Sequence, residues 1–350
     1  MEKIVLGIET SCDDTSIGIL KGSLGHYDKC PEVLSHVSFS QEKILEQWGG
    51  VVPEIAARNH LEKITPLLDI AMREASLKLS QIDIVGVTTL PGLLGPLLTG
   101  VNAAKTLCLL EKLPLNPVNH LFAHLEAIHL TEIVSYPYIG LLVSGGHSLY
   151  IYMESPLKFK ILGSTIDDAA GEAFDKGGKL MGLGYPAGRI IDDMAKLGDK
   201  NAYDFPIGLK SSGDCKLSYS GLKTFLRHMI EKDNSVLEKE NINNLCASYQ
   251  KAIVDALSLK LRYALEGNNN LPIVVGGGVA CNSALRNELK EKYNNVHFVA
   301  PKFCTDNGAM IANYALRTPE NLLNFPDCLQ IDARGRFIKK GKLHESSQSK

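Results

Sequence analysis

The stretch that decides the fold is residues 4–20, IVLGIETSCDDTSIGIL, in which two apolar runs are joined by a short polar segment. The two runs, 4–8 and 16–20, have the length and composition of buried strands, and the polar residues between them are typical of a tight turn. The same strand–turn–strand pattern returns at residues 138–153, YIGLLVSGGHSLYIYM. The recurrence suggests an architectural duplication.

Beyond these stretches, predicted helices alternate with predicted strands, which indicates an α/β protein. We expect helices at about 54–76, 97–111, 120–131, 241–266 and 306–316 and one beginning near 282, with further strands at 82–88, 273–275 and 296–299. A chain of 350 residues exceeds what one core usually organises, so two domains are expected. Residues 198–221 are polar and rich in Gly and Ser, which favours a long loop or an insertion.

Composition excludes several classes of protein. The net charge of -2 gives no global field that would attract a polyanion, so nucleic-acid binding would need a local patch or a partner. None of the eight cysteines forms a C-x-x-C pair, so neither a zinc ribbon nor a thioredoxin motif is present. The first residues show no signal-peptide pattern, and a cytoplasmic protein with reduced thiols is expected.

One apolar segment requires a membrane check. Residues 90–110 are strongly apolar, but they are interrupted by Pro91, Pro96, Asn102 and Lys105. A membrane-spanning helix needs about 20 predominantly apolar residues without such interruptions. We therefore expect a buried loop and helix here, and no membrane association.

Two histidines form the first candidate site. His120 and His124 stand four residues apart, which places both imidazoles on one face of a helix, close enough to share a metal. Asp306, at the start of a predicted helix, is the candidate third ligand, although an aspartate there can equally be a helix cap. Two histidines and one carboxylate leave coordination positions open, which suits a Lewis acid or a substrate-binding metal, and iron and zinc both fit.

Two Gly-rich turns form the second candidate site. Val143, Ser144, Gly145, Gly146 and His147 follow one apolar strand, and residues 275–282, VGGGVACN, follow another. Glycines there let backbone N–H groups approach a phosphate, and the helix that begins after the second turn adds a favourable dipole. Asn282 is a candidate for hydrogen bonding to a ribose or a base.

Further polar residues lie where an α/β sheet places ligands. Glu9 and Asp13 follow the carboxyl end of the first strand, and both are candidates for accepting a proton. Asp175, Gly188 and Asp192 occur in the segment EAFDKGGKLMGLGYPAGRIID, which suggests the wall of a pocket.

Taken together, these segments resemble the TsaD family, the tRNA threonylcarbamoyladenosine transferases once described as O-sialoglycoprotein endopeptidases. The resemblance runs from residue 4 to about 318 and covers many segments in order. They are GIETSCDDT (7–15), GGVVPEIAAR (49–58), the His120/His124 pair, VSGGH (143–147), EAFDK (172–176), SYSGLKT (218–224), GGGVA (276–280) with Asn282, and CTDN (304–307).

The resemblance implies an actin-like ATPase (ASKHA) architecture built from two RNase-H-like domains. The first would span 1–118 and be completed by the helix at 304–320. The second would span 119–303 with an insertion near 198–225, and 330–350 would form a basic tail, in which Arg334 and Arg336 are followed by four lysines.

The family also implies an activity and its site. The enzyme would transfer the threonylcarbamoyl group of threonylcarbamoyl-AMP to N6 of adenosine 37 in tRNAs that read codons starting with A, together with TsaB-like and TsaE-like partners. One divalent metal, Fe²⁺ with Zn²⁺ as the alternative, would be held by His120, His124 and Asp306. The substrate adenylate would be bound by Val143, Ser144, Gly145, Gly146, His147, Asp175, Gly188 and Asn282, with help from Asp192.

Departures from the family pattern leave alternatives open. Leu90 and Ala187 stand where relatives usually carry glycine, and Leu45 stands where a histidine is common. Another actin-like ATPase or kinase would bind Mg-ATP through carboxylates and have no use for a histidine pair. A metalloprotease would require Glu at position 121, where this chain has Leu121. A non-catalytic paralogue would lack ligands, and all three are present.

Overall fold

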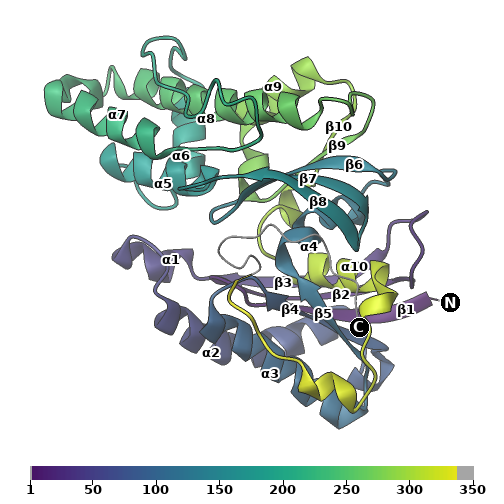
Figure 1. Cartoon of the computed structure of the whole chain (residues 1–350). Helices are drawn as coiled ribbons and strands as arrows, with labels where there is room; N and C mark the ends of the chain where they lie inside the picture. Colours follow the sequence, from purple (N-terminus) through teal and green to yellow (C-terminus); the bar gives the residue numbers. More distant parts are fainter. Residues whose placement is uncertain (1, 337–350) are drawn as a thin grey trace. The chain divides into compact units, whose positions relative to one another are not determined.

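A computed structural model describes residues 2–336 of the chain, which form two compact units (Figure 1). Unit 1 comprises residues 1–134, 154–159 and 305–350, and unit 2 comprises residues 135–153 and 160–304. The expected boundary at 118/119 precedes the observed division, because the helix that begins at His120 packs within unit 1 against the helix at 308–317. The helix at 308–317 belongs to unit 1.

Unit 1 is built on a mixed five-stranded sheet in the order β3-β2-β1-β4-β5. Its strands are β1 (Glu2–Glu9), β2 (Asp14–Ser23), β3 (Glu32–Ser40), β4 (Ile84–Leu90) and β5 (Leu115–Asn119). Its helices are α1 (Glu42–Leu45), α2 (Pro53–Glu74), α3 (Leu94–Glu111), α4 (His120–Glu126) and α10 (Gly308–Arg317). Strand β1 is antiparallel to β2 and parallel to β4, and helices α2 and α3 cover one face of the sheet while α10 covers the other (Figure 1).

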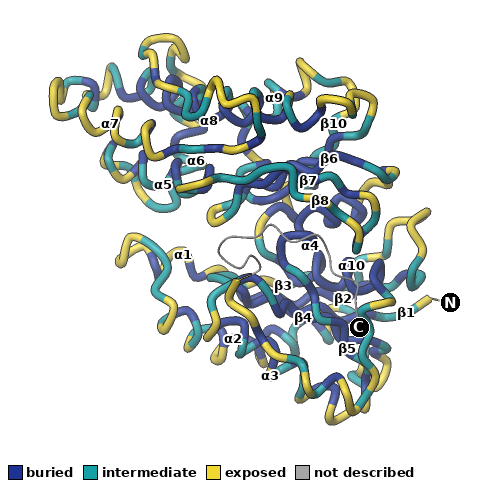
Figure 2. Tube along the Cα trace, viewed as in Figure 1, coloured by how far each residue is buried: buried dark blue, intermediate teal, exposed yellow. Residues whose placement is uncertain are grey.

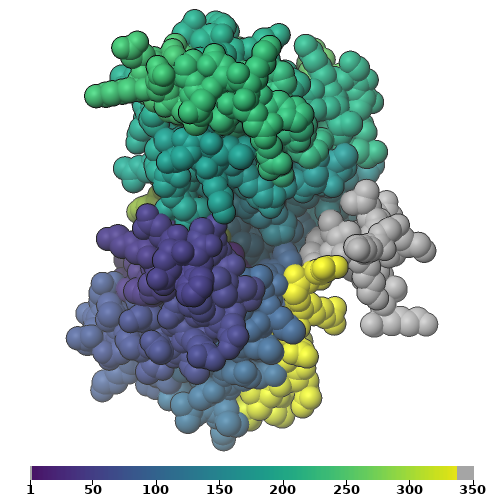
Figure 3. All heavy atoms as spheres, turned by 90° about the vertical axis from the view of Figure 1, so that its left-hand side faces the viewer, coloured from purple at the N-terminus to yellow at the C-terminus, as the bar shows by residue number. Residues whose placement is uncertain are grey.

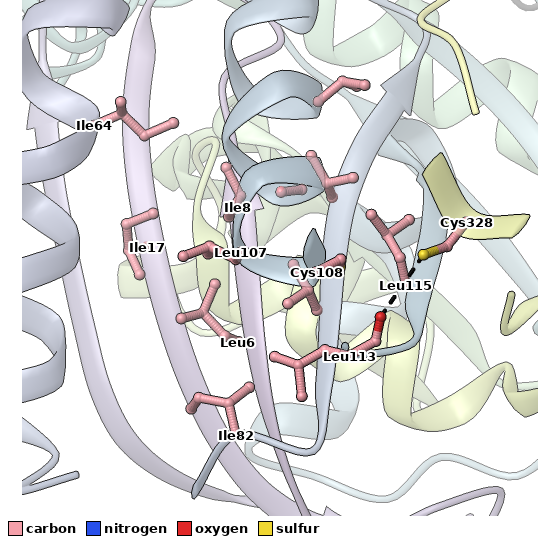
Figure 4. Packing of buried hydrophobic residues seen from close by; sticks show 14 of the residues in the cluster. Leu6, Ile8, Ile17, Ile64, Ile82, Leu107, Cys108, Leu113, Leu115 and Cys328 are labelled. Atoms are coloured by element: carbon pink, nitrogen blue, oxygen red, sulfur yellow. Dashed lines mark hydrogen bonds between the residues drawn. The ribbon is translucent and has the colours of Figure 1, made fainter. Parts of the chain in front are cut away.

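The main core of unit 1 lies between the sheet and helices α2 and α3 (Figure 4). Leu6, Ile8 and Ile17 project from β1 and β2 toward Leu107 of α3, and all four are buried. Successive side chains of a strand point to opposite faces of the sheet, so Leu6 and Ile8 share the face that α3 covers. The other face is covered by α10, and β1 and β2 are therefore buried on both faces. Burial of each such side chain contributes about 1.5–3 kcal/mol relative to exposure, so this core is what fixes the sheet.

The opposite face of the sheet receives α10 at unusually short range. A Cβ atom added at Gly7 would lie 2.2 Å from the carbonyl oxygen of Gly308, and one added at Gly18 would lie 2.3 Å from the amide nitrogen of Ala309. Only glycine permits this approach. The Gly308 amide also donates to Ser16 Oγ at 2.9 Å, so the start of α10 is tied directly to β2.

Unit 2 repeats the strand arrangement of unit 1. Its sheet has the order β10-β9-β6-β7-β8, with β6 antiparallel to β7 and parallel to β9. The strands are β6 (Tyr138–Val143), β7 (Ser148–Ser155), β8 (Lys158–Ser164), β9 (Ile273–Gly276) and β10 (Val296–Phe298). Read in the opposite direction, β8-β7-β6-β9-β10, this order corresponds strand for strand to β3-β2-β1-β4-β5 of unit 1. The duplication expected from residues 4–20 and 138–153 is therefore confirmed, and so is the α/β class.

The helices of unit 2 are α5 (Ala170–Leu180), α6 (Ala187–Ala195), α7 (Ser220–Lys232), α8 (Ile242–Ala264) and α9 (Ser283–Lys292). Helix α8 packs against both α6 and α9 and is buried along most of its length, as the dark trace in Figure 2 shows. Between α6 and α7, residues 198–219 form neither helix nor strand, in agreement with the loop expected at 198–221.

The segment after α10 lies on the surface of unit 1. Residues 319–336, yellow in Figure 3, run beside the blue part of the same unit. Leu115 and Leu323 exchange backbone hydrogen bonds, and the Arg334 amide donates to the carbonyl oxygen of Thr89. The remainder of the expected basic tail, 337–350, lies outside the described residues. Within the described part, no helix is long and apolar enough to cross a membrane.

Candidate metal centre and candidate nucleotide site

Local structure places the three predicted ligands at the starts of two helices. Helix α4 begins with His120 immediately after β5, and the Asn119 side chain caps it by accepting the Leu121 amide at 3.0 Å. Asp306 lies two residues before α10, whose cap is Asn307, accepting the Met310 amide at 2.8 Å. Asp306 is therefore not itself the helix cap.

The side chains of His120, His124 and Asp306 converge on one point. The two Nε2 atoms are 3.2 Å apart, and Asp306 Oδ1 lies 3.1 Å from His124 Nε2 and 3.5 Å from His120 Nε2. Ligands about 2.0–2.2 Å from one metal ion and 90–110° apart stand about 3.0–3.5 Å from each other. The triangle therefore fits a single divalent metal, and three protein ligands leave further positions open.

Glu9 supports the first of these ligands. Its carboxylate is fully buried and accepts hydrogen bonds from the Ser11 amide at 2.6 Å and the Thr88 hydroxyl at 2.6 Å. Its Oε2 atom also lies 3.1 Å from His120 Nδ1. A carboxylate on Nδ1 fixes the ring orientation and leaves Nε2 to face the metal. This geometry favours a positioning role for Glu9 over the proton-accepting role expected from the sequence.

The site holds more negative charge than its own histidines balance. Burial raises the pKa of Asp13 to about 6 and that of Asp14 to about 8, and the charge of Asp306 adds to both shifts. Burial disfavours charge on His120, but the carboxylates of Asp306 and Glu9 raise its pKa to about 9. Burial, reinforced by the charge of His120, lowers the pKa of His124. A divalent cation would relieve the carboxylate repulsion and displace the His120 proton.

His60 is a buried residue that the sequence reasoning missed. It lies on α2, and its Nδ1 is 2.7 Å from Thr15 Oγ1 while its Nε2 is 3.0 Å from the carbonyl oxygen of Cys12. These bonds hold the β1–β2 turn that carries Asp13. A histidine on the apolar face of the expected helix 54–76 was the available signal. Ser11 and Thr88 were missed as well, because contacts of single hydroxyl groups leave no sequence pattern.

In unit 2 the two Gly-rich turns lie side by side. Gly277 has a φ of +92°, and a Cβ atom there would lie 2.3 Å from the carbonyl oxygen of Val143. The other turn is closed by the Ser144 amide, which donates to the carbonyl oxygen of His147 at 2.8 Å. A Cβ atom at Gly145 or Gly146 would meet nothing within 4 Å, so the backbone is open to approach on that side.

The remaining predicted binding residues join three helices of unit 2. Asp175 on α5 accepts the Ala187 amide at 2.8 Å, at the start of α6. Asp192 on α6 accepts the Ser283 hydroxyl at 2.7 Å, at the start of α9. Asn282 caps α9 by accepting the Leu285 amide and donates to Gln250 at 2.6 Å. These groups thus fix the helix starts around the turns, and Gly188 lies in the first turn of α6.

Ala187, which stands where relatives usually carry glycine, fits into the packing between α5 and α6. A Cβ atom added at Gly178 would come within 2.1 Å of the Ala187 methyl group, so Ala187 occupies space that Gly178 leaves on α5. Ala187 is buried, and its amide keeps the bond to Asp175.

A separate cavity of about 590 Å³ is lined by residues of 200–210, Phe225 and α8, and none of the predicted site residues lines it.

The two sheets of matching strand order define a protein of the actin-like ATPase fold, and the His–His–Asp triangle of unit 1 is a candidate metal site. Solved structures of that fold agree. Full-length HypF in its phosphate- and nucleotide-bound form covers 91% of this chain and 46% of its own with a TM-score of 0.56 at 14% identity. Component A of the Acidaminococcus fermentans (R)-2-hydroxyglutaryl-CoA dehydratase matches with a TM-score of 0.53 at 15% identity. The match covers 91% of this chain and 99% of component A.

Sequence comparison gives the particular family. The family model described as TsaD, tRNA N6-adenosine threonylcarbamoyltransferase, matches residues 32–313. Proteins of that name are 40% identical in Lactococcus lactis subsp. cremoris, covering 96% of this chain and 98% of theirs, and 44% identical in Syntrophus aciditrophicus, covering 92% and 93%. The chain belongs to the TsaD family. It is a transferase that modifies tRNA, and the expected family resemblance is confirmed.

Proposed function

We propose that this enzyme transfers the threonylcarbamoyl group from threonylcarbamoyl-AMP to N6 of adenosine 37 in tRNAs reading codons that start with A. The donor triangle of His120, His124 and Asp306 is the observation that carries the proposal. Kinases of the same fold bind their metal mainly through carboxylates and substrate phosphates, and two buried imidazoles facing one carboxylate serve a different kind of ligand.

The residues of unit 1 supply a Lewis-acid site. Fe²⁺ is the proposed ion and Zn²⁺ the alternative; when bound, it would polarise the carbonyl of the threonylcarbamoyl group. Glu9 holds the His120 ring through Nδ1, and Asn119 and Asn307 fix the helix starts on which the ligands stand. Asp13, with a pKa of about 6, is half-exposed at the same end of the sheet and is the better placed acceptor for the proton of the adenine amine.

The turns of unit 2 would hold the adenylate. Open backbone at Gly145 and Gly146, next to the Gly277 turn, suits a phosphate, because backbone N–H groups can approach it without a side chain in between. The adenylate is already activated, so the reaction needs no covalent nucleophile on the protein. Positioning of the amine against the carbonyl then supplies most of the rate enhancement. TsaB-like and TsaE-like proteins are the proposed partners.

Mass spectrometry of digested tRNA tests the activity. The protein, its companions, tRNA, threonine, bicarbonate and ATP should yield threonylcarbamoyladenosine, and His124→Ala should abolish the product and the bound metal while the circular dichroism spectrum is retained. His26→Ala, at an exposed histidine of the same unit, is the matched control and should keep both. Product formation by metal-stripped protein would contradict the proposal, and product loss with normal metal content in Asp306→Ala would remove Asp306 from the ligand set.

A second variant addresses the adenylate turn. Gly146→Val places a side chain in open space, so stability should be unchanged while the KM for the adenylate rises. Gly221→Ala, at another position with nothing within 4 Å of the added Cβ atom, is the control and should behave as the parent protein. An unchanged KM in Gly146→Val would move the phosphate elsewhere.

A further inference from the structure

Two cysteines in unit 2 form a cluster that the proposed reaction does not use. Cys281 ends the short 3-10 helix that follows β9 (Gly278–Cys281), and Cys304 follows a second such helix (Pro301–Phe303). Their thiols hydrogen-bond to each other. Cys281 is exposed, whereas Cys304 is completely buried. An accessible thiol next to a second thiol is typical of redox-sensitive sites. There an oxidant converts the first thiol to a sulfenic acid, and the second thiol condenses with it to a disulfide.

Arg286 is built into this cluster as a fixed cation. Its Nε donates to the carbonyl oxygen of Ala280 at 2.7 Å and its Nη2 to that of Val299 at 3.1 Å, and its guanidinium lies 4.7 Å from the centroid of the Phe298 ring. The side chain therefore cannot swing away from Cys281. A neighbouring cation stabilises the thiolate, which is the reactive form.

The two thiols differ in acidity. The hydrogen bond from Cys304 lowers the pKa of Cys281 to about 7, against an opposing effect of burial, and the charge of Arg286 lowers it further. The Cys304 S–H can also donate to the Val299 carbonyl oxygen, which lies 3.2 Å from its sulfur. Among the described residues, Cys304 and Arg286 are the titratable groups that act on Cys281.

A second cysteine pair shows what the cluster would be without the cation. Cys108 and Cys328 also contact each other, but both are buried in the core of unit 1. Burial raises the pKa of Cys108 to about 12, and no cation contributes to its shift. Proximity of thiols is thus common to both pairs, whereas exposure and an arginine distinguish Cys281.

We propose that Cys281 is a peroxide-reactive thiol and that Cys304 resolves it to a reversible intramolecular disulfide. The Cys281 thiolate attacks one oxygen of hydrogen peroxide, the O–O bond breaks, and hydroxide leaves, giving Cys281 sulfenic acid. The Cys304 sulfur then attacks the Cys281 sulfur, and the S–O bond breaks. The Cys304 proton and the sulfenic oxygen leave in a second water molecule. Two thiols are oxidised by two electrons and one peroxide is reduced to two waters.

The position of the disulfide links it to the proposed reaction. Cys281 directly precedes Asn282, and Cys304 stands two residues before Asp306, so the bond would constrain a segment of each proposed site. This consequence, unlike the disulfide itself, rests on the proposed function. We expect oxidation to lower the rate of threonylcarbamoyladenosine formation and a thiol reductant to restore it.

Peptide mapping of the full-length protein tests the disulfide without any assay of activity. After one equivalent of hydrogen peroxide and blocking of free thiols, a non-reducing digest should contain the peptide linking Cys281 to Cys304 and none linking Cys108 to Cys328. Cys304→Ser should instead accumulate a sulfenic acid on Cys281 that dimedone traps. Absence of the 281–304 peptide under conditions that already oxidise the exposed Cys30, or equal formation of the 108–328 peptide, would overturn the proposal.

The rate of alkylation gives a second measure. Cys30 is exposed, but burial of its sulfur keeps its pKa above the usual 9.0, so it is the matched control for Cys281. The more acidic thiol has a larger thiolate fraction but a less nucleophilic thiolate. With the usual pKa of 9.0 as the lower limit for Cys30, the ratio of Cys281 to Cys30 alkylation rates should be at least about 3 at pH 7.5 and at least about 10 at pH 6.5. Equal alkylation rates of Cys281 and Cys30 at both pH values would show that Cys281 is not an activated thiol.

The effect on turnover has its own arm. The turnover of Cys281→Ser should be the same before and after treatment with peroxide, whereas that of the parent protein should fall. Fully disulfide-linked protein with undiminished turnover would overturn the coupling to the reaction. Absence of turnover in all samples, with the 281–304 peptide present, would instead count against the proposed function alone.

Discussion

Substitution of Gly18 by alanine tests how the fold positions Asp306, the proposed metal ligand that lies two residues before α10. The added methyl group would lie 2.3 Å from the amide nitrogen of Ala309 and 2.5 Å from the carbonyl carbon of Gly308. Ordinary contacts of this kind are about 3.5 Å, so the start of α10 must move away from β2 by about 1 Å. That movement would also break the 2.9 Å bond from the Gly308 amide to Ser16.

Two magnitudes follow from this displacement. Overpacking of a close-packed layer costs about 1–3 kcal/mol, which in a unit of this size lowers the unfolding midpoint by about 2–4 °C for each kcal/mol. Asp306 precedes Gly308 by two residues, and metal–ligand distances tolerate only about 0.2 Å. Loss of support around a metal ligand typically weakens binding by about 10- to 100-fold, and we expect Gly18→Ala to fall in this range.

The assay is thermal unfolding of the metal-free protein combined with titration of the metal against a competing chelator. Gly86→Ala is the matched control, because it faces the same helix but its nearest neighbours are the Ala315 methyl group at 3.0 Å and the Ile311 carbonyl oxygen at 3.3 Å. Its effects should be clearly smaller in both measurements. If Gly18→Ala has the unfolding midpoint of the parent protein and a metal Kd within twofold of the parent value, the close contact between Gly18 and the start of α10 does not position Asp306.

Three further predictions concern charge in unit 1. Because the pKa of His120 is about 9 without metal, metal binding at pH 7.5 should release about one proton from this ring. Apparent affinity should therefore fall about tenfold per unit as the pH drops from 9 to 7, and proton release measured in weakly buffered solution should vanish near pH 10. Breaking the buried pair in which Arg317 Nε donates to Glu126 Oε2 at 2.7 Å, by Arg317→Met, should cost about 3–5 kcal/mol in unfolding experiments, whereas Lys158→Met at an exposed pair should change nothing measurable. In Glu9→Gln, the side-chain oxygen can keep its bond to the Ser11 amide only if the NH₂ group turns toward His120 Nδ1, which would move the ring proton to Nε2. Nitrogen NMR of the metal-free protein above pH 9 should detect this tautomer. An unchanged spectrum would contradict the positioning role of Glu9.

The central strands were predictable because they are short apolar runs that end in polar or Gly-rich turns, and they are buried along nearly their whole length. The long helices were predictable from apolar residues at helical spacing. The helix expected at 54–76 is α2 at Pro53–Glu74, and the one expected at 97–111 is α3, which begins three residues earlier at Leu94. Strand β3 was missed, since it is an edge strand with few buried residues and no clear alternation. Helices α5 and α6 were missed because glycines at 177, 178 and 188 lower helix propensity. Tertiary packing stabilises them: α6 packs against α8, and α5 packs mainly against α6 and α7.

The metal ligands were foreseeable in part. The four-residue spacing of His120 and His124 carries its own geometry, since a helix places both rings on one face. Asp306 lies 182 residues from His124, and no local pattern could show that the two meet at 3.1 Å. Its place at a predicted helix start made it a candidate, and the family resemblance strengthened that choice. Glu9 was noticed for its place at a strand end, but its bond to His120 depends on the β1–β4–β5 register, so its positioning role emerged only with the fold.

The duplicated fold uses one location for two kinds of chemistry. In unit 1 the turn after the first strand is polar, and through Glu9 and Ser11 it supports His120, a candidate metal ligand. In unit 2 the corresponding turn is Gly145 and Gly146, whose side is open and offers backbone alone. The shared sheet order explains why both turns stand at the carboxyl edge of a sheet, where α/β folds bind ligands. The side chains at the turn, not the fold, therefore decide which ligand each unit is suited to bind.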